Sequence, residues 1–232
     1  MVLEELNSAV TELLSLHTAA GTTAAHFESK GRELLTRLQN RIMALRKLPI
    51  QTVFRKAPRI VRDACATTGK KVSLEMTGGS ISVSRGILQA LDEVLMHILR
   101  NAVAHGAETS KEREILGKTP ECNIRIEAIE MPGGEIAMRI NDDGRGIDFN
   151  ALQAKAINNG IIPPGQNLSP QDLTNLLFLP GLSSADKVTE TAGRGMGMDI
   201  VKRHLEAIGG RIEISSSPGQ GTQFLILVSN PQ

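Results

Sequence analysis

The chain has 232 residues, 41% of them hydrophobic and 22% charged, a balance that can bury a core and is not typical of disorder. Its 26 Lys and Arg nearly balance 25 Asp and Glu, and Trp and Tyr are absent, so neither charge nor stacking favours nucleic acid as a partner. Two distant cysteines and the lack of an apolar run long enough for a bilayer predict a reduced, cytoplasmic protein without direct membrane insertion.

Residues 1–49 are predicted to form a helical hairpin. Leucine-rich positions recur at helical spacing in the first 14 residues and again over 34–45, on either side of the break at Gly21-Thr22-Thr23. One hairpin buries only part of each apolar stripe, so pairing with a second copy into a four-helix bundle is favoured, which would make the protein a homodimer. The alternative is a hairpin that packs on its own globular domain. Pro49 ends the segment, because the residue before a proline is pushed out of helical geometry.

Residues 50–232 are predicted to form a second domain, in which strands and helices do not alternate as they would in a parallel doubly wound sheet. We therefore expect an α+β protein: a two-layer α/β sandwich with helices on one face of a mixed sheet. A stretch interrupted by Gly and Pro, with short helices, is expected from about 149 to 192. The other expected elements are a short helix at 58–68, a strand at 71–76, a long helix at 87–103, strands at 122–129 and 135–140, a helix at 198–208, and a hairpin of strands 211–215 and 222–228.

Three short motifs resemble known binding loops but lack a residue that the chemistry requires. Gly117-Lys118-Thr119 ends like a phosphate-binding P-loop, yet Glu112 stands where the first glycine of that loop is needed. Residues 141–148 resemble the start of a calcium loop, but Arg145 replaces an oxygen ligand. The glycines of 193–197 have neither the spacing nor the preceding strand of a dinucleotide fingerprint.

Three other elements predict a nucleotide site when they are taken together. His97, Asn101 and His105 recur at every fourth position of the long helix, as a polar strip beside an apolar face. Asp142 follows an alternating strand and precedes two spaced glycines, which allow a sharp turn against a flat ring. Gly193–Gly197 lead into a helix, whose free N–H groups and dipole suit phosphate. Each element alone has an ordinary alternative, respectively a hydrogen-bonding helix edge, an acidic turn and a flexible hinge, but their succession is hard to explain by coincidence.

In this order the elements resemble the Bergerat-type ATPase fold shared by DNA gyrase, the large heat-shock chaperone, histidine kinases and MutL. Residues 97–106 look like its N box, 142–146 like its first glycine box, and 193–197 like its second. The segment 178–184 is similar to the F box and its continuation in the ATP lid. The two-histidine N box and the glycine-rich stretch before Asp-Ile-Val-Lys point to the CheA family of chemotaxis histidine kinases, over essentially all of residues 34–229.

The resemblance implies that ATP and Mg²⁺ bind here, in a protein-histidine kinase. Asp142 is expected to receive the adenine amino group, Thr222 to help hold the base through water, and Asn101 to place its amide oxygen on Mg²⁺. The implied catalytic residues are His97, which is to orient or deprotonate the attacking imidazole, together with Asn101 and Lys155. The implied nucleotide-binding residues are Arg100, Asn101, His105, Asp142, Gly144, Gly146, Ile147, Lys155, Ser183, Gly193, Arg194, Gly195, Met196, Gly197 and Thr222.

The family transfers the γ-phosphoryl group of ATP to a histidine, which we expect on a separate histidine phosphotransfer domain. Neither His17 nor His26 has the surroundings of an acceptor motif, so both are interpreted as structural. From that domain the phosphoryl group is expected to reach a response regulator. A coupling protein and chemoreceptors are further expected partners, provided that a regulatory domain follows the last strand.

Two positions depart from the family pattern: Ala104 stands where the family usually has Asp, and Leu182 where it usually has Phe. These departures favour an alternative function, a catalytically weak nucleotide-binding dimerisation scaffold of a chemosensory array. A clamp-type ATPase like gyrase or MutL is a second alternative, but it needs an N-box glutamate to activate water, and the corresponding turn here offers His97. Transfer kinetics distinguish the kinase from the scaffold, and phosphate release without an acceptor would favour the clamp-type ATPase.

Overall fold

The computed structural model describes residues 11, 31–32, 36, 47–179, 182 and 198–230. By its internal contacts the chain divides into two compact units, Met1–Lys47 and Leu48–Gln232. The predicted helical hairpin falls almost wholly outside the described residues, and so do His17 and His26. The candidate site is therefore built from the second unit alone.

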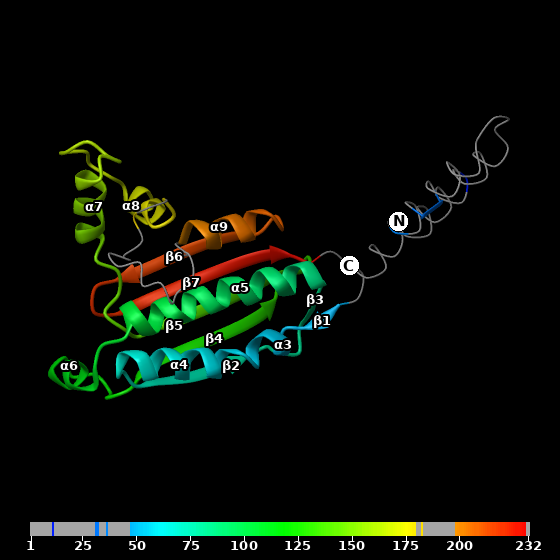
Figure 1. Cartoon of the computed structure of the whole chain (residues 1–232), viewed down its shortest axis with the longest axis horizontal. Helices are drawn as coiled ribbons and strands as arrows, with labels where there is room; N and C mark the ends of the chain where they lie inside the picture. The colour runs from blue at the N-terminus through cyan, green and yellow to red at the C-terminus, as the bar shows by residue number, and fades with distance from the viewer. Residues whose placement is uncertain are drawn as a thin grey trace. The chain divides into compact units, whose positions relative to one another are not determined.

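The second unit combines helices and strands in the irregular order that the sequence predicts (Figure 1). The short elements β1, α3, β3 and α6 were not predicted, because two to six residues carry too little periodicity. The elements are β1 (Leu48–Pro49), α3 (Gln51–Phe54), α4 (Ala57–Thr68), β2 (Val72–Thr77), β3 (Ser82–Val83), α5 (Arg85–Asn101), a π-helix (Ala102–Gly106), α6 (Ser110–Ile115), β4 (Cys122–Glu130), β5 (Glu135–Asp142), α7 (Phe149–Asn158), α8 (Pro170–Leu176), α9 (Met198–Glu206), β6 (Arg211–Ser217) and β7 (Gly221–Ser229).

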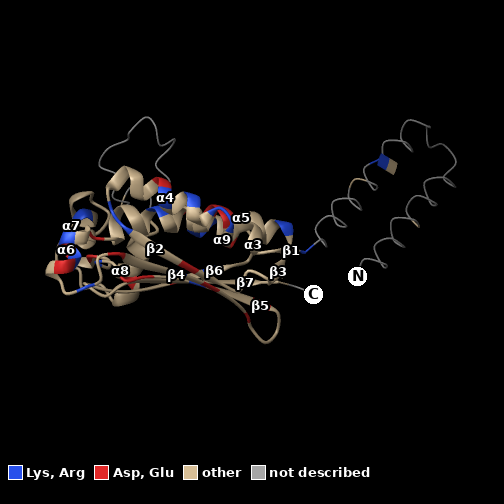
Figure 2. Cartoon of the chain, turned by 90° about the horizontal axis from the view of Figure 1, so that it is seen from below, with Lys and Arg blue, Asp and Glu red and all other residues tan. Residues whose placement is uncertain are grey.

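The main sheet has the strand order β2-β4-β5-β7-β6. Strand β2 runs parallel to β4, and the remaining neighbours pair antiparallel, so the predicted mixed sheet is confirmed. Helices α4, α5 and α9 cover one face of this sheet (Figure 2). Alternate residues of β5, namely Ile136, Met138 and Ile140, are buried in the core that the helices and the sheet share.

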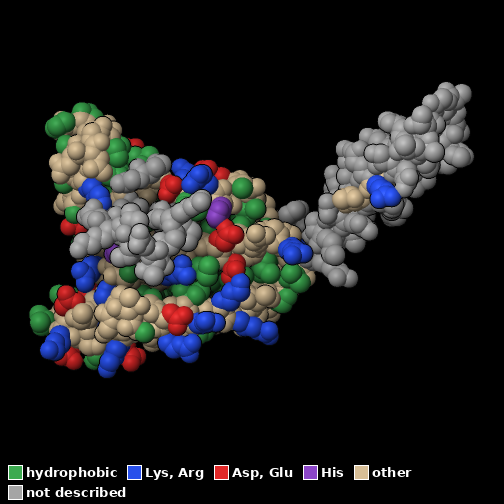
Figure 3. Space-filling view, in the orientation of Figure 1, with side chains coloured by type: hydrophobic (Ala, Val, Ile, Leu, Met, Phe, Trp, Pro, Cys, Tyr) green, Lys and Arg blue, Asp and Glu red, His purple; other side chains and the backbone are tan. Residues whose placement is uncertain are grey.

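Helix α5 is the central helix of the core and carries part of the candidate site. It begins at Arg85 because the Ser84 side chain accepts a hydrogen bond from the Ile87 N–H, 3.4 Å away, as an N-cap. Its apolar face includes Leu91, Leu95, Ile98 and Leu99, which are at most 1% exposed. Each such burial contributes about 1.5–3 kcal/mol, so the helix is firmly held and its polar edge has a fixed position. On the face seen in Figure 3, cationic and anionic side chains are interspersed, as the balanced composition leads one to expect.

Candidate nucleotide-binding site

A cavity of about 410 Å³ opens among α5, the segment after β5, α7 and the first residue of α9. Its volume lies within the range of pockets that hold small ligands and cofactors. Most of the described residues predicted for the site line this cavity, whereas Arg100 and Gly144 do not. The lining residues are His97, Asn101, Ala102, His105, Gly106, Asp142, Gly146, Ile147, Asp148, Ala151, Leu152, Lys155, Leu177, Leu182, Met198, Thr222 and Phe224.

Asp142 is the last residue of β5 and is only 9% exposed. Its Oδ1 atom accepts a hydrogen bond from the Gly144 N–H at 3.0 Å. Burial raises the pKa of Asp142 to about 6, and the hydrogen bonds from the backbone of Gly144 and Thr222 act against this rise. The group is therefore mostly ionised at neutral pH, and it offers a buried acceptor for an N–H donor on a ligand.

The glycines that follow Asp142 are required by close backbone packing. A Cβ on Gly144 would overlap the carbonyl oxygen of Gly106, and that oxygen also accepts a hydrogen bond from the Arg145 N–H at 2.8 Å. Gly146 has φ +74°, and a Cβ there would overlap the carbonyl oxygen of Ser217. The sequence predicts that both glycines let the chain approach a flat ring, but only Gly146 lines the cavity. Gly144 instead joins the loop to the end of the π-helix.

Ser216 on β6 connects this loop to the terminal hairpin, and sequence reasoning missed it. Its Oγ accepts from the Ile147 N–H at 2.9 Å, donates to the Gly221 carbonyl at 2.9 Å, and lies 3.1 Å from Thr222 Oγ1. Ser216 and Thr222 are also cross-strand partners in the register of β6 and β7. The predicted strand stops at Ser215 and the predicted turn covers 218–221, so the sequence carried no signal for this pairing; β6 in fact continues to Ser217 and sets Ser216 opposite Thr222.

His97 and Asn101, the part of the predicted polar strip that belongs to α5, line the cavity. The amide nitrogen of Asn101 lies 2.9 Å from His97 Nε2 and 3.6 Å from Met198 Sδ, so the amide oxygen is the atom left to meet a ligand. Burial, aided by the charge of Arg100, lowers the pKa of His97, and the neutral ring can accept the hydrogen bond from the amide. Arg100 itself is exposed and does not line the cavity. Its positive charge nevertheless acts on His97.

The predicted long helix does not continue in α-helical form to Val103. It changes at Asn101 into the π-helix, whose wider turn is closed by a 2.6 Å hydrogen bond from the Ala107 N–H to the Ala102 carbonyl. Lys70 supports this turn, because its Nζ donates to the carbonyls of Val103 at 3.0 Å and of Ala104 at 2.6 Å.

The π-helix brings His105 to the cavity next to positive charge. Burial, together with the charges of Lys70 and Arg145, lowers the pKa of the His105 ring. A neutral donor ring with two cations nearby suits an anionic group such as phosphate. The next residue, Gly106, lies beside Asp142, because a Cβ on it would be 3.4 Å from Asp142 Oδ1.

Residues 86–232 match the family described as histidine kinase-, DNA gyrase B-, and HSP90-like ATPase. The chain belongs to this ATPase family. It is 42% identical over 205 residues to chemotaxis protein CheA of Rhizobium meliloti (strain 1021), an alignment that covers 88% of this chain and 27% of that protein. It is 37% identical over 191 residues to CheA of Salmonella typhimurium (strain LT2), with 82% and 28% covered. The family predicted from the motifs is thereby confirmed.

Solved structures agree on the fold of this ATPase domain. The catalytic domain of the histidine kinase ThkA superposes with a TM-score of 0.50 at 14% identity, and the match covers 81% of this chain and 98% of that one. At this level of identity the likeness concerns the fold alone. The chain spans about a quarter of the length of the two CheA proteins, since 27% and 28% of those proteins are covered.

In the ATPase domain, α7 and α8 form the described part of the segment 149–192. Helix α7 begins where Asp148 Oδ1 accepts from the Ala151 N–H at 2.9 Å, and it brings Lys155 to the cavity. Leu182 is 2% exposed and packs with Ala156 and Leu176, so the shorter side chain at this departure from the family pattern is still buried. The remaining predicted residues of this region lie outside the described part: Ser183, Gly193, Arg194, Gly195, Met196 and Gly197.

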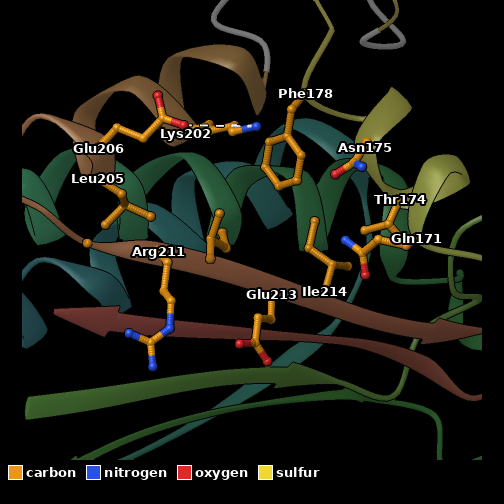
Figure 4. Close-up of a pocket in the computed structure, with 12 residues that line it drawn as sticks. Gln171, Thr174, Asn175, Phe178, Lys202, Leu205, Glu206, Arg211, Glu213 and Ile214 are labelled. Atoms are coloured by element: carbon orange, nitrogen blue, oxygen red, sulfur yellow. Dashed lines mark ion pairs between the residues drawn. The ribbon is translucent and has the colours of Figure 1, made fainter.

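Phe178, the aromatic residue of the F box, lies outside the nucleotide cavity. It packs against the main core and lines a second cavity of about 290 Å³ between α8, α9 and β6 (Figure 4). Lys202 on α9 places its Nζ 5.6 Å from the centre of the Phe178 ring and 3.9 Å from Glu206. Phe178 therefore ties the chain just after α8 to α9.

An ATPase of this family uses ATP, and the cavity can be tested for its fit to Mg-ATP. No group of three His, Cys, Asp or Glu residues in the described ranges is placed to hold a metal ion. Mg²⁺ needs few protein ligands when it takes oxygens from water and phosphate, and the Asn101 amide oxygen fits that role.

In the part of the chain that the structure covers, no helix combines the length and the apolar character needed to cross a membrane.

Proposed function

We propose that this chain is the ATP-binding core of a dimeric, cytoplasmic chemotaxis histidine kinase. In this proposal it transfers the γ-phosphoryl group of Mg-ATP to a histidine on a separate phosphotransfer domain, which then supplies a response regulator. The observation that carries the proposal is one cavity with a buried acceptor, Asp142, and the hydrogen-bonded pair His97–Asn101 in its lining. Similarity to CheA proteins over 82–88% of the chain supports the chemotaxis assignment.

The base is recognised at the end of the cavity where β5 finishes. Asp142 accepts from the exocyclic amino group of adenine, and the Thr222 hydroxyl, oriented by Ser216 at 3.1 Å, assists through water. Apolar lining residues such as Ile147 and Phe224 exclude bulk water from this part of the cavity. Hydrogen bonds to the base are stronger in such surroundings, which favours specificity for adenine.

The phosphates are bound along α5, where His97 and Asn101 line the cavity. When bound, Mg²⁺ neutralises phosphate charge and holds the phosphate oxygens in place. Asn101 presents its amide oxygen to the ion, while His105 and Lys155, which line the cavity, stabilise the negative charge of the phosphate tail. Arg100 lies outside the lining and is proposed to add only its positive charge. His97 has a lowered pKa and is neutral, so it can orient the acceptor imidazole. Its Nε2 atom accepts from the Asn101 amide, so the ring can take the proton that this imidazole loses once that hydrogen bond opens.

The leucine-rich residues 1–49 are proposed to pair with those of a second copy into a four-helix bundle, as the sequence pattern predicts. Sedimentation equilibrium should then give twice the mass of the chain. A coupling protein and chemoreceptors remain proposed partners of the whole kinase, of which this chain spans a part.

The direct test is incubation of the chain with γ-labelled ATP, Mg²⁺ and a histidine phosphotransfer domain. The proposal expects acid-labile label on the histidine of that domain. Label on His17 or His26 of the chain itself would refute a separate acceptor. ATP binding without any transfer would support the second candidate, the scaffold favoured by Ala104 and Leu182. Phosphate release without an acceptor would instead indicate a clamp-type ATPase.

A further inference from the structure

A cluster of four charged side chains, two of them buried, lies next to the loop that follows Asp142 (residues 143–147). Arg113 on α6 is fully buried, and it donates to Glu108 Oε2 and to Asp143 Oδ2, both at 2.8 Å. Glu108 is 2% exposed, and its other oxygen accepts from Lys118 Nζ at 2.8 Å. Two cations thus meet two carboxylates, and the cluster is fully paired.

The cluster also binds the backbone of the loop. Lys118 Nζ donates to the carbonyls of Asp143 and Gly144 at 2.8 Å each, and Arg113 donates to the Asp143 carbonyl at 3.2 Å. The N–H of the same Gly144 holds Asp142 Oδ1. Gly144 therefore connects the two side chains: its carbonyl accepts from Lys118, and its N–H donates to Asp142.

The charges of the cluster act on Asp142 as well. Both Asp143 and Glu108 raise the pKa of Asp142, because like charges disfavour its ionised form. Arg113 and Lys118 pair with these two acids and offset their effect. Loss of either cation would leave a neighbouring negative charge uncompensated, and Asp142 would take up a proton at higher pH.

We propose that Arg113 and Lys118 are positioning residues for adenine recognition, which act on Asp142 through Asp143 and Gly144. This inference rests on the proposed nucleotide-binding function and extends it to residues outside the cavity. Lys118 belongs to Gly117-Lys118-Thr119, which resembles the end of a P-loop. Here the lysine binds the backbone of the loop beside the adenine acceptor, and it does not bind the phosphates.

The test compares Lys118→Met with Lys111→Met, which removes the same charge from an exposed position of α6. Dissociation constants of ATP and GTP are measured by calorimetry with the full chain between pH 5.5 and 8. GTP is the probe because guanine carries a carbonyl where adenine carries the amino group, so in the orientation of adenine it offers Asp142 an acceptor instead of a donor. Lys118→Met is expected to weaken ATP binding about tenfold and GTP binding less than twofold, which matches the loss of charge-assisted hydrogen bonds.

The pH profile gives a readout that a purely structural role would not move. The midpoint of ATP binding should shift to higher pH in Lys118→Met, to lower pH in Asp143→Asn, and not at all in Lys111→Met. The Asp143→Asn variant retains an oxygen that can accept from the Asn123 N–H, so it gives a second, independent readout if Lys118→Met unfolds. Equal losses for ATP and GTP, or unmoved midpoints, overturn the inference. Failure of the wild type to bind ATP would instead overturn the proposed function.

Discussion

Replacement of Asp142 by Asn is predicted to stabilise the folded chain while it weakens the binding of ATP. The pKa of Asp142 rises from an ordinary 3.8 to about 6 on folding, so between these values the folded state holds more protons than the unfolded state. Stability therefore falls as pH rises through this window. Ionised Asp142 costs about 3 kcal/mol at pH 7, at about 1.4 kcal/mol per pKa unit. The Asn variant escapes this cost, and its free energy of unfolding should rise by up to that amount.

The same group sets the pH dependence of binding, because only ionised Asp142 is a full acceptor. Its ionised fraction falls from about nine tenths at pH 7 to about one tenth at pH 5, so the affinity for ATP should fall about tenfold. Asp142→Asn should show only the smaller dependence that comes from titration of the phosphates. Urea unfolding and calorimetry at both pH values measure the two effects. A variant less stable than the wild type at pH 7, or a wild-type affinity equal at both pH values, would refute this reasoning.

Three further substitutions test the site. Gly146→Ala adds a clash with a backbone carbonyl to the strain of φ +74°, so it should reduce ATP affinity by more than tenfold and lower the melting temperature. The control Gly160→Ala has φ +68° but open space around it, so it should bring only the strain of about 1–2 kcal/mol. Ser216→Ala frees the Ile147 N–H and should weaken ATP binding about fivefold by calorimetry, at about 1 kcal/mol per hydrogen bond; exposed Ser215→Ala should have no effect. His97→Gln should slow phosphoryl transfer at least a hundredfold in quench-flow measurements and leave the ATP dissociation constant within about threefold.

The sequence predicted the parts of the fold and site that depend on local periodicity. The four-residue spacing placed His97 and Asn101 on one edge of α5, and alternation placed Asp142 at the end of β5, where all three line the cavity. The mixed sheet followed from strands that do not alternate with helices. These features depend on residues that are close together in the chain, and the spacing of residue types predicts such local structure.

Features that depend on distant partners could not be predicted in this way. The π-helix after Asn101 is supported by Lys70, which lies more than thirty residues earlier. Nothing in the local sequence pattern marks Arg113 as buried, and it is buried because it pairs with Asp143 and Glu108. The apolar lining of the cavity, such as Phe224, has the same alternation as ordinary core. Only the three-dimensional arrangement shows which apolar residues line the cavity and which belong to the core.

Calorimetric titration of the wild-type chain with ATP, with and without Mg²⁺, tests the central claim most directly. The account predicts one nucleotide per chain, bound more tightly with Mg²⁺. Asp142→Ala should remove most of the affinity under both conditions, and Asn101→Ala should remove only the gain that Mg²⁺ provides. A wild type that takes up no nucleotide, or variants that bind ATP as tightly as the wild type, would contradict it.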